Sequence, residues 1–412
     1  MDLPFRYVAP AGAPFSVGDL VRWAGTAVSR PSVAEALVEA MRNRFGVRHV
    51  FLTSTGRAGL TLLLRALRRL EPARDEVAIP SYTCYSVPAS IAKAGLRPRL
   101  IDISPDTLDF APAALAEHDF SRTLAIVATN LYGLPSDLPG LQQLARAHGL
   151  FLVDDAAQAM GASVGGRWSG TWGDAGLYSF DKGKNVSAID GGVVVTNSED
   201  LAAAVRAEMS DATAAGATLS PAHVVKALAY FVMLRPWLYG IPARLPQLGL
   251  GRTEYTTEYP LSLPDPMLTA LALTMLPKLE AFTATRQANA AAILDALSSI
   301  PGVDTIAVRR DATPAYLRLP ILLADRHAQV GAIQALNAAG IGASGSYPQS
   351  LADVPELRQT ATSPRAAGGR RVAHGIVTLP THPFVSPADI RRMRSVLSTG
   401  AAVAAKERML TT

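Results

Sequence analysis

The sequence predicts an α/β fold, in which a mostly parallel sheet flanked by helices is followed by a smaller C-terminal α+β domain. Over the first two-thirds of the chain, short apolar runs alternate with segments of helical spacing, and from about residue 277 the pattern changes to a long helical segment with a few strands. Alternating strands and helices are typical of a parallel sheet, because each parallel strand needs a crossover connection. We therefore expect a large domain over 1–275 and a small domain over 276–412.

The first elements expected in the large domain are two helices with a strand between them. Residues 32–45 have helical spacing, and residues 56–70 repeat apolar side chains at intervals of three and four. The apolar run 50–52 lies between these helices and is typical of a strand. Further short apolar runs predict strands at 76–80, 99–103, 124–129, 150–153, 176–180 and 192–196.

The small domain is expected to begin with a long helix over 277–297. Strands are expected near 315–319 and 376–379, and helices over 328–339 and 387–397. No internal repeat or low-complexity tract stands out, so nothing in the pattern indicates a solenoid or a long disordered region.

Composition excludes several classes of protein. A chain of 412 residues with 49% hydrophobic content can bury a large core. Its single cysteine cannot form an intramolecular disulfide, and no charged-then-apolar signal opens the chain, so a reducing, cytoplasmic setting is expected. The formal charge of +5 comes from scattered basic residues without interleaved aromatics, so nucleic acid is not an expected partner. No metal site is predicted.

Two motifs carry chemistry. Asp154–Gln158 (DDAAQ) follows an apolar run that predicts a buried strand, and Ser179–Asn185 (SFDKGKN) lies shortly after it. The carboxyl end of a strand is where α/β sheets place ligands. Pyridoxal phosphate requires an amine that condenses with its aldehyde and a carboxylate that faces its pyridine nitrogen. The two motifs supply both groups.

A phosphate site is predicted separately. Residues 53–57 (TSTGR) lie between the strand-like run 50–52 and a helix, so free backbone N–H groups at the helix N-terminus can face an anion. The alternative interpretation is that the Ser and Thr residues only cap the helix.

The order and spacing of seven short motifs resemble one enzyme family. From about Asn43 to Leu397 the chain is similar to the DegT-type (DegT/DnrJ/StrS) sugar aminotransferases, which are pyridoxal phosphate enzymes of the aspartate-aminotransferase fold, fold type I. The resemblance implies L-glutamate or L-glutamine as amino donor, a nucleotide-linked keto sugar as acceptor in amino-sugar, polysaccharide or secondary-metabolite biosynthesis, and a homodimer. The motifs are residues 53–60, 80–83, 155–159, 173–176, 179–180, 184–185 and 190–192.

The resemblance also implies roles for individual residues. Lys184 matches the lysine that forms the Schiff base and then acts as general base, whereas Lys182 either lowers the pKa of that amine or is simply solvated. Asp155 matches the partner of the pyridine nitrogen, and Asp154 matches a neighbour that points away. Gln158 matches the residue that hydrogen-bonds the phenolic oxygen of the cofactor.

The cofactor phosphate has its own expected ligands. By the same resemblance, Gly56 and Arg57 donate backbone N–H groups and Ser179 adds its hydroxyl. The aromatic residue that stacks on the cofactor ring in the family is replaced by Cys84. Tyr85 or Tyr82 can supply the stack instead, or Cys84 can give a sulfur contact.

Other departures lie around the substrate and the subunit boundary. Asn130 and Ser346 stand where the family has His, and the Asn-x-Arg element that comes from the partner subunit is not recognisable in 253–259. Three alternatives therefore stay open: amination of a non-sugar or lipid-linked ketone, a non-catalytic protein with this fold, and sugar dehydration. The dehydration variant typically has His in place of the lysine, so Lys184 argues against it.

An aromatic, apolar insert at about 210–262 is the most unusual segment. Its core, 224–250, is too short and too broken by proline to span a bilayer. It is expected either to pack against the core or a second subunit, or to lie on a membrane surface or contact a lipid carrier, which would make the protein membrane-peripheral.

Overall fold

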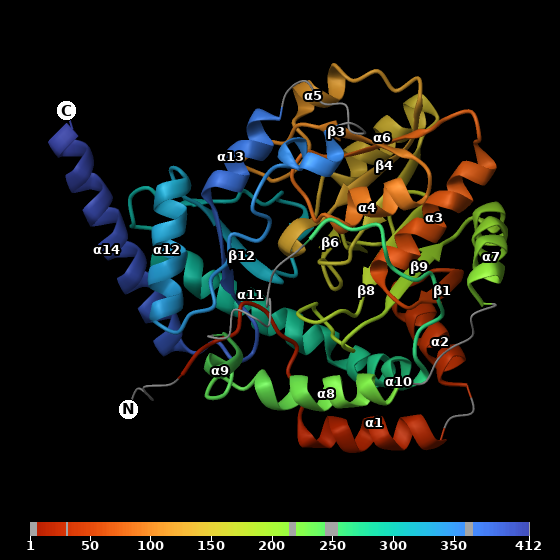
Figure 1. Ribbon diagram of the computed structural model, residues 1–412, viewed down its shortest axis with the longest axis horizontal. Coiled ribbons are helices and arrows are strands. Elements are labelled where there is room, and N and C mark those ends of the chain that lie inside the picture. The colour runs from red at the N-terminus through yellow and green to blue at the C-terminus, as the bar shows by residue number, and fades with distance from the viewer. Residues whose placement is uncertain (1–5, 30–31, 214–219, 244–253, 359–365, 412) are drawn as a thin grey trace.

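The computed structural model describes residues 6–29, 32–213, 220–243, 254–358 and 366–411, in which a central sheet lies between two layers of helices (Figure 1). This arrangement confirms the predicted α/β fold with a mostly parallel sheet. The sheet order is β1 (His49–Thr53), β9 (Gly192–Thr196), β8 (Ala175–Ser179), β5 (Phe151–Asp155), β4 (Thr123–Thr129), β2 (Glu76–Pro80) and β3 (Arg97–Ile101).

The direction of the strands brings the predicted site residues together at the carboxyl ends of β1, β8 and β5. All neighbouring strands from β8 to β3 are parallel, and only β9 is antiparallel to both of its neighbours. Thr53 at the end of β1 and Ser179 at the end of β8 both lie opposite Gly192, and Asp155 at the end of β5 lies opposite Leu177. The ends of β1, β8 and β5 therefore meet where an α/β sheet binds ligands.

Both faces of the sheet are covered, as the continuous apolar strands require. Within β9, Val194 packs on one face, while Val193 and Val195 pack on the other. Helices α3 (Gly56–Leu70), α4 (Ser86–Lys93) and α7 (Glu199–Thr213) cover the first face, and α2 (Val33–Phe45), α6 (Leu138–His148) and α10 (Pro266–Met275) cover the second.

The C-terminal part has a hydrophobic core of its own, which Val8 from the N-terminal segment joins. It contains α11 (Leu279–Leu297), an antiparallel sheet of β10 (Asp304–Thr305), β12 (Arg318–Leu322) and β13 (Ile376–Pro380), and the helices α12 (Arg326–Ala338), α13 (Ala367–Gly375) and α14 (Pro387–Thr411). The domain boundary at residue 275 stays a prediction. Short elements are α5 (Pro112–Ala116), η1 (Leu131–Gly133), η3 (Leu276–Lys278), η4 (Leu351–Asp353), η5 (Pro355–Leu357) and a sheet of β11 (Ala312–Thr313), β6 (Ser163–Val164) and β7 (Arg167–Trp168).

The strand displaced furthest from its prediction is β12, although others also shift, such as β3, which was expected at 99–103 and spans Arg97–Ile101. A strand was expected at 315–319, but β12 begins at Arg318. The Thr381 hydroxyl donates to the carbonyl oxygens of Tyr316 (2.6 Å) and Leu317 (3.3 Å), and Tyr316 has a left-handed φ of 45°. A long-range hydrogen bond thus holds the preceding residues out of the strand, and no local pattern signals it.

The described part of the apolar insert forms α8 (Pro221–Met233) and α9 (Gly240–Ala243), and residues 244–250 lie outside the described residues. Helix α8 runs beside α1 (Val17–Ser29) (Figure 1). The continuous helical run Pro266–Leu297 is long and apolar enough to cross a membrane, but 56% of its apolar window is buried inside the protein.

Candidate functional site

The N-terminus of α3 forms a cradle against the end of β8. The Thr55 hydroxyl caps the helix by accepting the Ala58 N–H at 3.0 Å. The N–H groups of Gly56 and Arg57 belong to the first turn, so they have no partner within the helix. A Cβ added to Gly56 would lie 3.4 Å from the Ser179 Cβ. The structure therefore brings Gly56, Arg57 and Ser179 together, as an anion site requires.

Asp155 is a buried carboxylate at the end of β5 that is influenced by the charge of Lys184. Asp155 is 9% exposed, and one of its carboxylate oxygens accepts the Ala157 N–H at 3.0 Å. Burial raises the pKa of Asp155, and this N–H and the positive charge of Lys184 partly offset the rise. Lys184 is half-buried, whereas Lys182 is exposed. A lysine and a carboxylate thus act on each other at the sheet edge beside the anion cradle.

Asp154 points the other way, into the protein. Its carboxylate accepts the Asn130 side-chain N–H at 2.8 Å and the backbone N–H groups of Gly170 (2.5 Å) and Trp172 (3.2 Å). The same Asn130 amide also donates to the Asp155 carbonyl oxygen at 2.8 Å. Asn130 therefore ties the two aspartates to one scaffold.

Burial raises the pKa of Asp154 to about 7, although its three donors oppose the shift. Between about pH 4 and pH 7 the unfolded chain releases this proton while the folded chain keeps it, so the contribution of Asp154 to stability falls as pH rises. We expect the stability difference between wild type and Asp154→Asn, measured by urea unfolding, to shrink by on the order of 3 kcal/mol from pH 4.5 to pH 7.5. A difference that does not change with pH would show that Asp154 is ionised throughout.

Gln158 is fixed from two sides. Its amide donates to the Tyr347 hydroxyl at 2.9 Å, and its oxygen accepts the Tyr132 N–H at 3.0 Å. Tyr132 has a φ of 58°, a strained conformation of the kind that recurs at functional sites. Tyr347 comes from the C-terminal part of the chain and was not among the predicted site residues. Its only sequence signal was its place beside Ser346, one of the departures from the family.

The three candidates for the ring contact lie in different environments. Tyr82 is fully buried, and its hydroxyl donates to the carbonyl oxygens of Gly345 and Tyr347, each at 3.3 Å. Tyr85 is also buried and packs 5.9 Å from the Tyr347 ring. Cys84 is half-buried and accepts a hydrogen bond from Ser86 at 3.0 Å. Of the three, Cys84 has the most accessible side chain, and a ring contact from Cys84 or Tyr85 stays a prediction.

The segment in which the Asn-x-Arg element was not recognisable packs beside the cradle of its own chain. The Tyr259 hydroxyl is 2.8 Å from the Thr61 hydroxyl and donates to Ser90 at 3.2 Å. Its ring centroid lies 5.0 Å from the Arg57 guanidinium carbon and 4.8 Å from the Lys93 amine. Sequence reasoning missed Tyr259, because nothing local connects it with α3.

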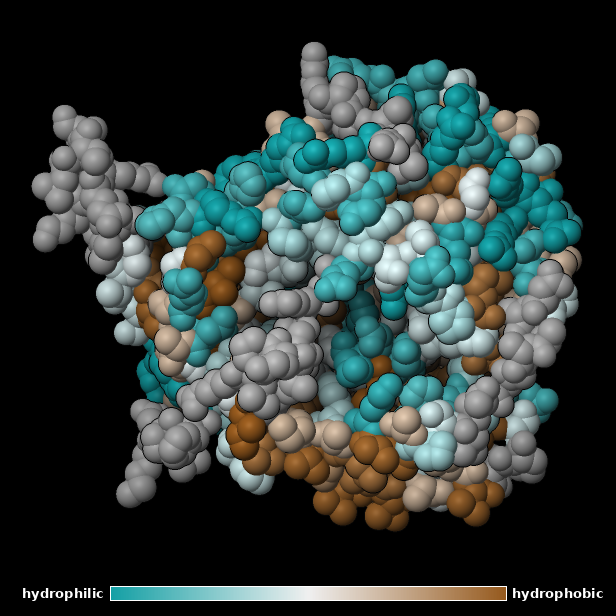
Figure 2. All heavy atoms as spheres, in the orientation of Figure 1, coloured by the Kyte–Doolittle hydropathy of each residue, from teal (hydrophilic) through white to brown (hydrophobic). Residues whose placement is uncertain are grey.

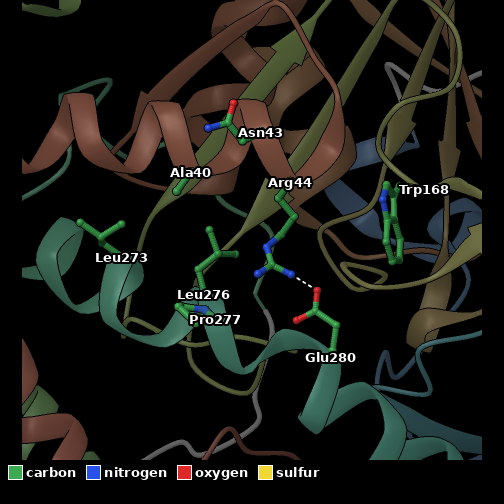
Figure 3. Close-up of a pocket in the computed structure, with 8 residues that line it drawn as sticks. All are labelled: Ala40, Asn43, Arg44, Trp168, Leu273, Leu276, Pro277 and Glu280. Atoms are coloured by element: carbon green, nitrogen blue, oxygen red, sulfur yellow. Dashed lines mark hydrogen bonds and ion pairs between the residues drawn. The ribbon is translucent and has the colours of Figure 1, made fainter.

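A separate surface hollow lies away from this edge. Its lining includes Trp168, Leu276 and an ion pair between Arg44 and Glu280 (Figure 3). Arg44 is near the end of α2, just before β1 begins. The hollow therefore lies near the start of β1, whereas Lys184 follows the carboxyl end of β8. Among the described residues, no group of three or more His, Cys, Asp or Glu side chains could hold a metal ion.

Comparison with known proteins finds aminotransferases that are similar to this chain. The chain is 38% identical over 157 residues to the UDP-N-acetyl-3-dehydro-alpha-D-glucosamine 3-aminotransferase of Acidithiobacillus ferrooxidans, covering 38% of this chain and 42% of that protein. It is 36% identical over 178 residues to the GDP-perosamine synthase of Caulobacter vibrioides, covering 42% and 47%. These alignments therefore span less than half the length of either relative.

Fold similarity extends over nearly the whole chain. The structure of Helicobacter pylori PseC, an aminotransferase involved in the biosynthesis of pseudoaminic acid, matches with a TM-score of 0.79 and 16% identity, covering 97% of this chain and 100% of PseC. Residues 25–223 and 261–398 match the model of the DegT/DnrJ/EryC1/StrS aminotransferase family. The chain belongs to the DegT/DnrJ/EryC1/StrS aminotransferase family.

Proposed function

We propose that the protein is a pyridoxal phosphate-dependent aminotransferase that moves an amino group from L-glutamate or L-glutamine to a nucleotide-linked keto sugar. Membership of the family indicates pyridoxal phosphate as the cofactor. The observation that carries the proposal is geometric: the ends of β5 and β8 bring the buried Asp155 beside the α3 cradle, and the charge of Lys184, in the segment that follows β8, acts on Asp155. Two curated relatives named as a nucleotide-sugar aminotransferase and a GDP-perosamine synthase support the sugar class.

The residues present fit this cofactor. Two buried hydroxyls, Ser54 Oγ just before the α3 cap and Thr83 Oγ1 just after β2, have no hydrogen-bond partner among the described residues, and buried polar atoms are rarely left so. In the proposal, the N–H groups of Gly56 and Arg57 and the Ser179 hydroxyl hold the phosphate. Bound there, pyridoxal phosphate supplies an aldehyde that carries the amino group and a ring that accepts electrons from the neighbouring carbon.

Three side chains of the protein carry out the remaining steps in this proposal. The Asp155 carboxylate has one oxygen bonded to Ala157, which leaves the other to hold a proton on the pyridine nitrogen. The Lys184 amine moves a proton to or from the substrate carbon that gains or loses the amino group. Gln158, fixed by Tyr132 and Tyr347, has a second amide proton free to donate to the phenolic oxygen.

Amination can be followed directly. The purified protein would be incubated with pyridoxal phosphate, a panel of keto nucleotide sugars and, in separate reactions, L-glutamate or L-glutamine labelled with ¹⁵N at the α-amino group, with mass spectrometry of the products. The proposal predicts an acceptor that gains ¹⁵N with wild type and not with Lys184→Ala. Transfer of ¹⁵N to the cofactor without transfer to any sugar would redirect the search to non-sugar or lipid-linked ketones. No transfer even to the cofactor would favour a non-catalytic protein.

The phosphate cradle gives a further prediction. A Cβ added to Gly192 would lie 2.3 Å from the Thr55 carbonyl oxygen, so Gly192→Ala must displace the residue that caps α3. We expect the Kd for pyridoxal phosphate, measured by absorbance titration, to rise roughly 10-fold or more. Gly331→Ala is the matched control, because an added Cβ there meets nothing within 4 Å. An unchanged Kd in Gly192→Ala would place the phosphate elsewhere.

The same proposal includes a cytoplasmic location, which the single cysteine favours. It also includes a homodimer. An apolar surface lies along α1 and α8 (Figure 2), where Val17 is 67% and Val225 65% exposed, and Trp237 just beyond α8 is 62% exposed. Patches of this kind commonly mark contact sites, and we propose a second copy as the occupant. Light scattering should then give the molar mass of a dimer for wild type. For Val225→Glu it should give a lower mean molar mass, because part of the dimer dissociates. A dimer that Val225→Glu leaves intact, together with flotation on anionic liposomes, would instead favour a membrane surface.

A further inference from the structure

Arg286, on α11, is a fully buried arginine. It is 0% exposed, and no carboxylate bonded to it is found in the described part of the chain. Burial lowers its pKa to about 10, so the guanidinium still carries its charge at neutral pH. Buried charges need specific partners, because they lose their hydration. The hydrogen-bond partners of Arg286 among the described residues are two backbone carbonyl oxygens, those of Asn185 at 3.2 Å and Gly12 at 2.8 Å, and its guanidinium carbon also lies 5.7 Å from the Phe282 ring centroid.

The Asn185 carbonyl is next to the proposed catalytic lysine. Residues 181–188, here called the lysine loop, run between β8 and β9 and carry Lys184. Both polar atoms of the Asn185 side chain are buried without a hydrogen-bond partner, so this side chain does not anchor the loop. The hydrogen bond from Arg286 therefore fixes the main chain one residue from Lys184.

Tyr230 of α8 contacts the same loop from a second direction. Its hydroxyl accepts the Ala13 N–H at 3.1 Å and interacts with Ser187 and with the Gly183 N–H. Ala13 follows the Gly12 that Arg286 holds. The N-terminal segment, α8 and α11 thus meet at the lysine loop. The apolar insert therefore supports this loop through α8, whatever covers its outer face.

We infer that Arg286, supported by Tyr230, is a positioning residue that sets the orientation of Lys184 by holding the main chain of the lysine loop. The inference deepens the proposed function, because it rests on Lys184 being the reactive amine. Arg286 itself touches neither substrate nor cofactor in this account. Its loss should therefore change the geometry and rate of the lysine chemistry while leaving donor binding nearly as it is.

The test compares Arg286→Met with Arg74→Met. Arg74 also donates to backbone carbonyl oxygens, those of Thr123, His148 and Gly149, but these lie at the start of β4 and just before β5, away from the lysine loop. Hydrogen exchange of the cofactor-free protein should show the Lys184 and Ala188 amides, bonded to Asp181 and Phe180, exchanging roughly 10-fold faster in Arg286→Met and unchanged in Arg74→Met. In the loaded enzyme, kcat should fall by about 10- to 100-fold with the KM for glutamate within about 3-fold.

Two further variants keep the inference testable if Arg286→Met folds poorly. Tyr230→Phe removes only a hydroxyl and should speed exchange of the same loop by a smaller factor. Arg286→Lys keeps the charge and one donor and should recover part of kcat. Unchanged exchange in both Arg286→Met and Tyr230→Phe would overturn the inference. A wild type that binds no cofactor would overturn the proposed function alone, because exchange is measured without the cofactor.

Discussion

Replacing Lys184 with alanine is expected to lower kcat for amino transfer by roughly 10⁴-fold or more. The reason is that this amine is proposed both to bond the cofactor and to carry the proton at the reacting carbon, and no neighbouring group can do both. Lys182 is the matched control: it lies two residues away in the same loop but is exposed. Lys182→Ala should keep kcat within about 3-fold, since a solvated charge contributes little.

Steady-state kinetics of Lys184→Ala and Lys182→Ala with glutamate and an accepted keto sugar would measure these changes in kcat. Urea unfolding should show wild-type stability for Lys182→Ala, because that side chain is exposed, and a still cooperative unfolding transition for Lys184→Ala, because Lys184 forms no ion pair among the described residues. If Lys182→Ala were the inactive variant and Lys184→Ala retained turnover, the assignment of the reactive lysine would be wrong.

Asp155→Asn should cause the second-largest loss, about 10²- to 10⁴-fold in kcat. The amide oxygen can still accept the Ala157 N–H, so the local fold is kept. The negative charge is lost, however, and a neutral amide cannot hold a proton on the pyridine nitrogen. The effect should appear in kcat with little change in the KM for glutamate.

Asp155→Glu provides the complementary variant, because it keeps the charge but moves it by one methylene. Partial recovery of kcat in Asp155→Glu over Asp155→Asn would support an electrostatic role. Equal activity in Asp155→Asn and wild type would mean that another group faces the ring nitrogen.

Local sequence patterns predicted the elements around the site well. The limits of α3, β2 and β9 coincide with the predicted 56–70, 76–80 and 192–196, because amphipathic spacing, a Thr cap and apolar runs bounded by turn residues are local signals. The late start of β12 was not predictable, and for α8 the pattern could not decide between packing on the core or a second subunit and contact with a membrane surface. The start of β12 and the packing of α8 both depend on partners far away in the chain, such as Thr381 and Ala13.

In the candidate site, too, residues in local motifs were predictable, and residues that act through distant contacts were not. Asp155, Lys184 and Gly56 stand in motifs, so their residue types and their spacing along the chain indicate their chemistry. Tyr347, Tyr259 and Arg286 act through contacts more than 100 residues apart in sequence, to Gln158, Thr61 and Asn185. An isolated arginine in the middle of a helix carries no sign of the carbonyl that it will hold.

The central claim is that Lys184 and Asp155 carry out amino transfer on pyridoxal phosphate. The most direct measurement is the visible absorbance of the purified protein with pyridoxal phosphate, before and after L-glutamate and then after a keto nucleotide sugar. The account predicts a yellow band that bleaches with glutamate and returns with the sugar, and neither change in Lys184→Ala. A band that no amino donor bleaches, or no band at all, would contradict it.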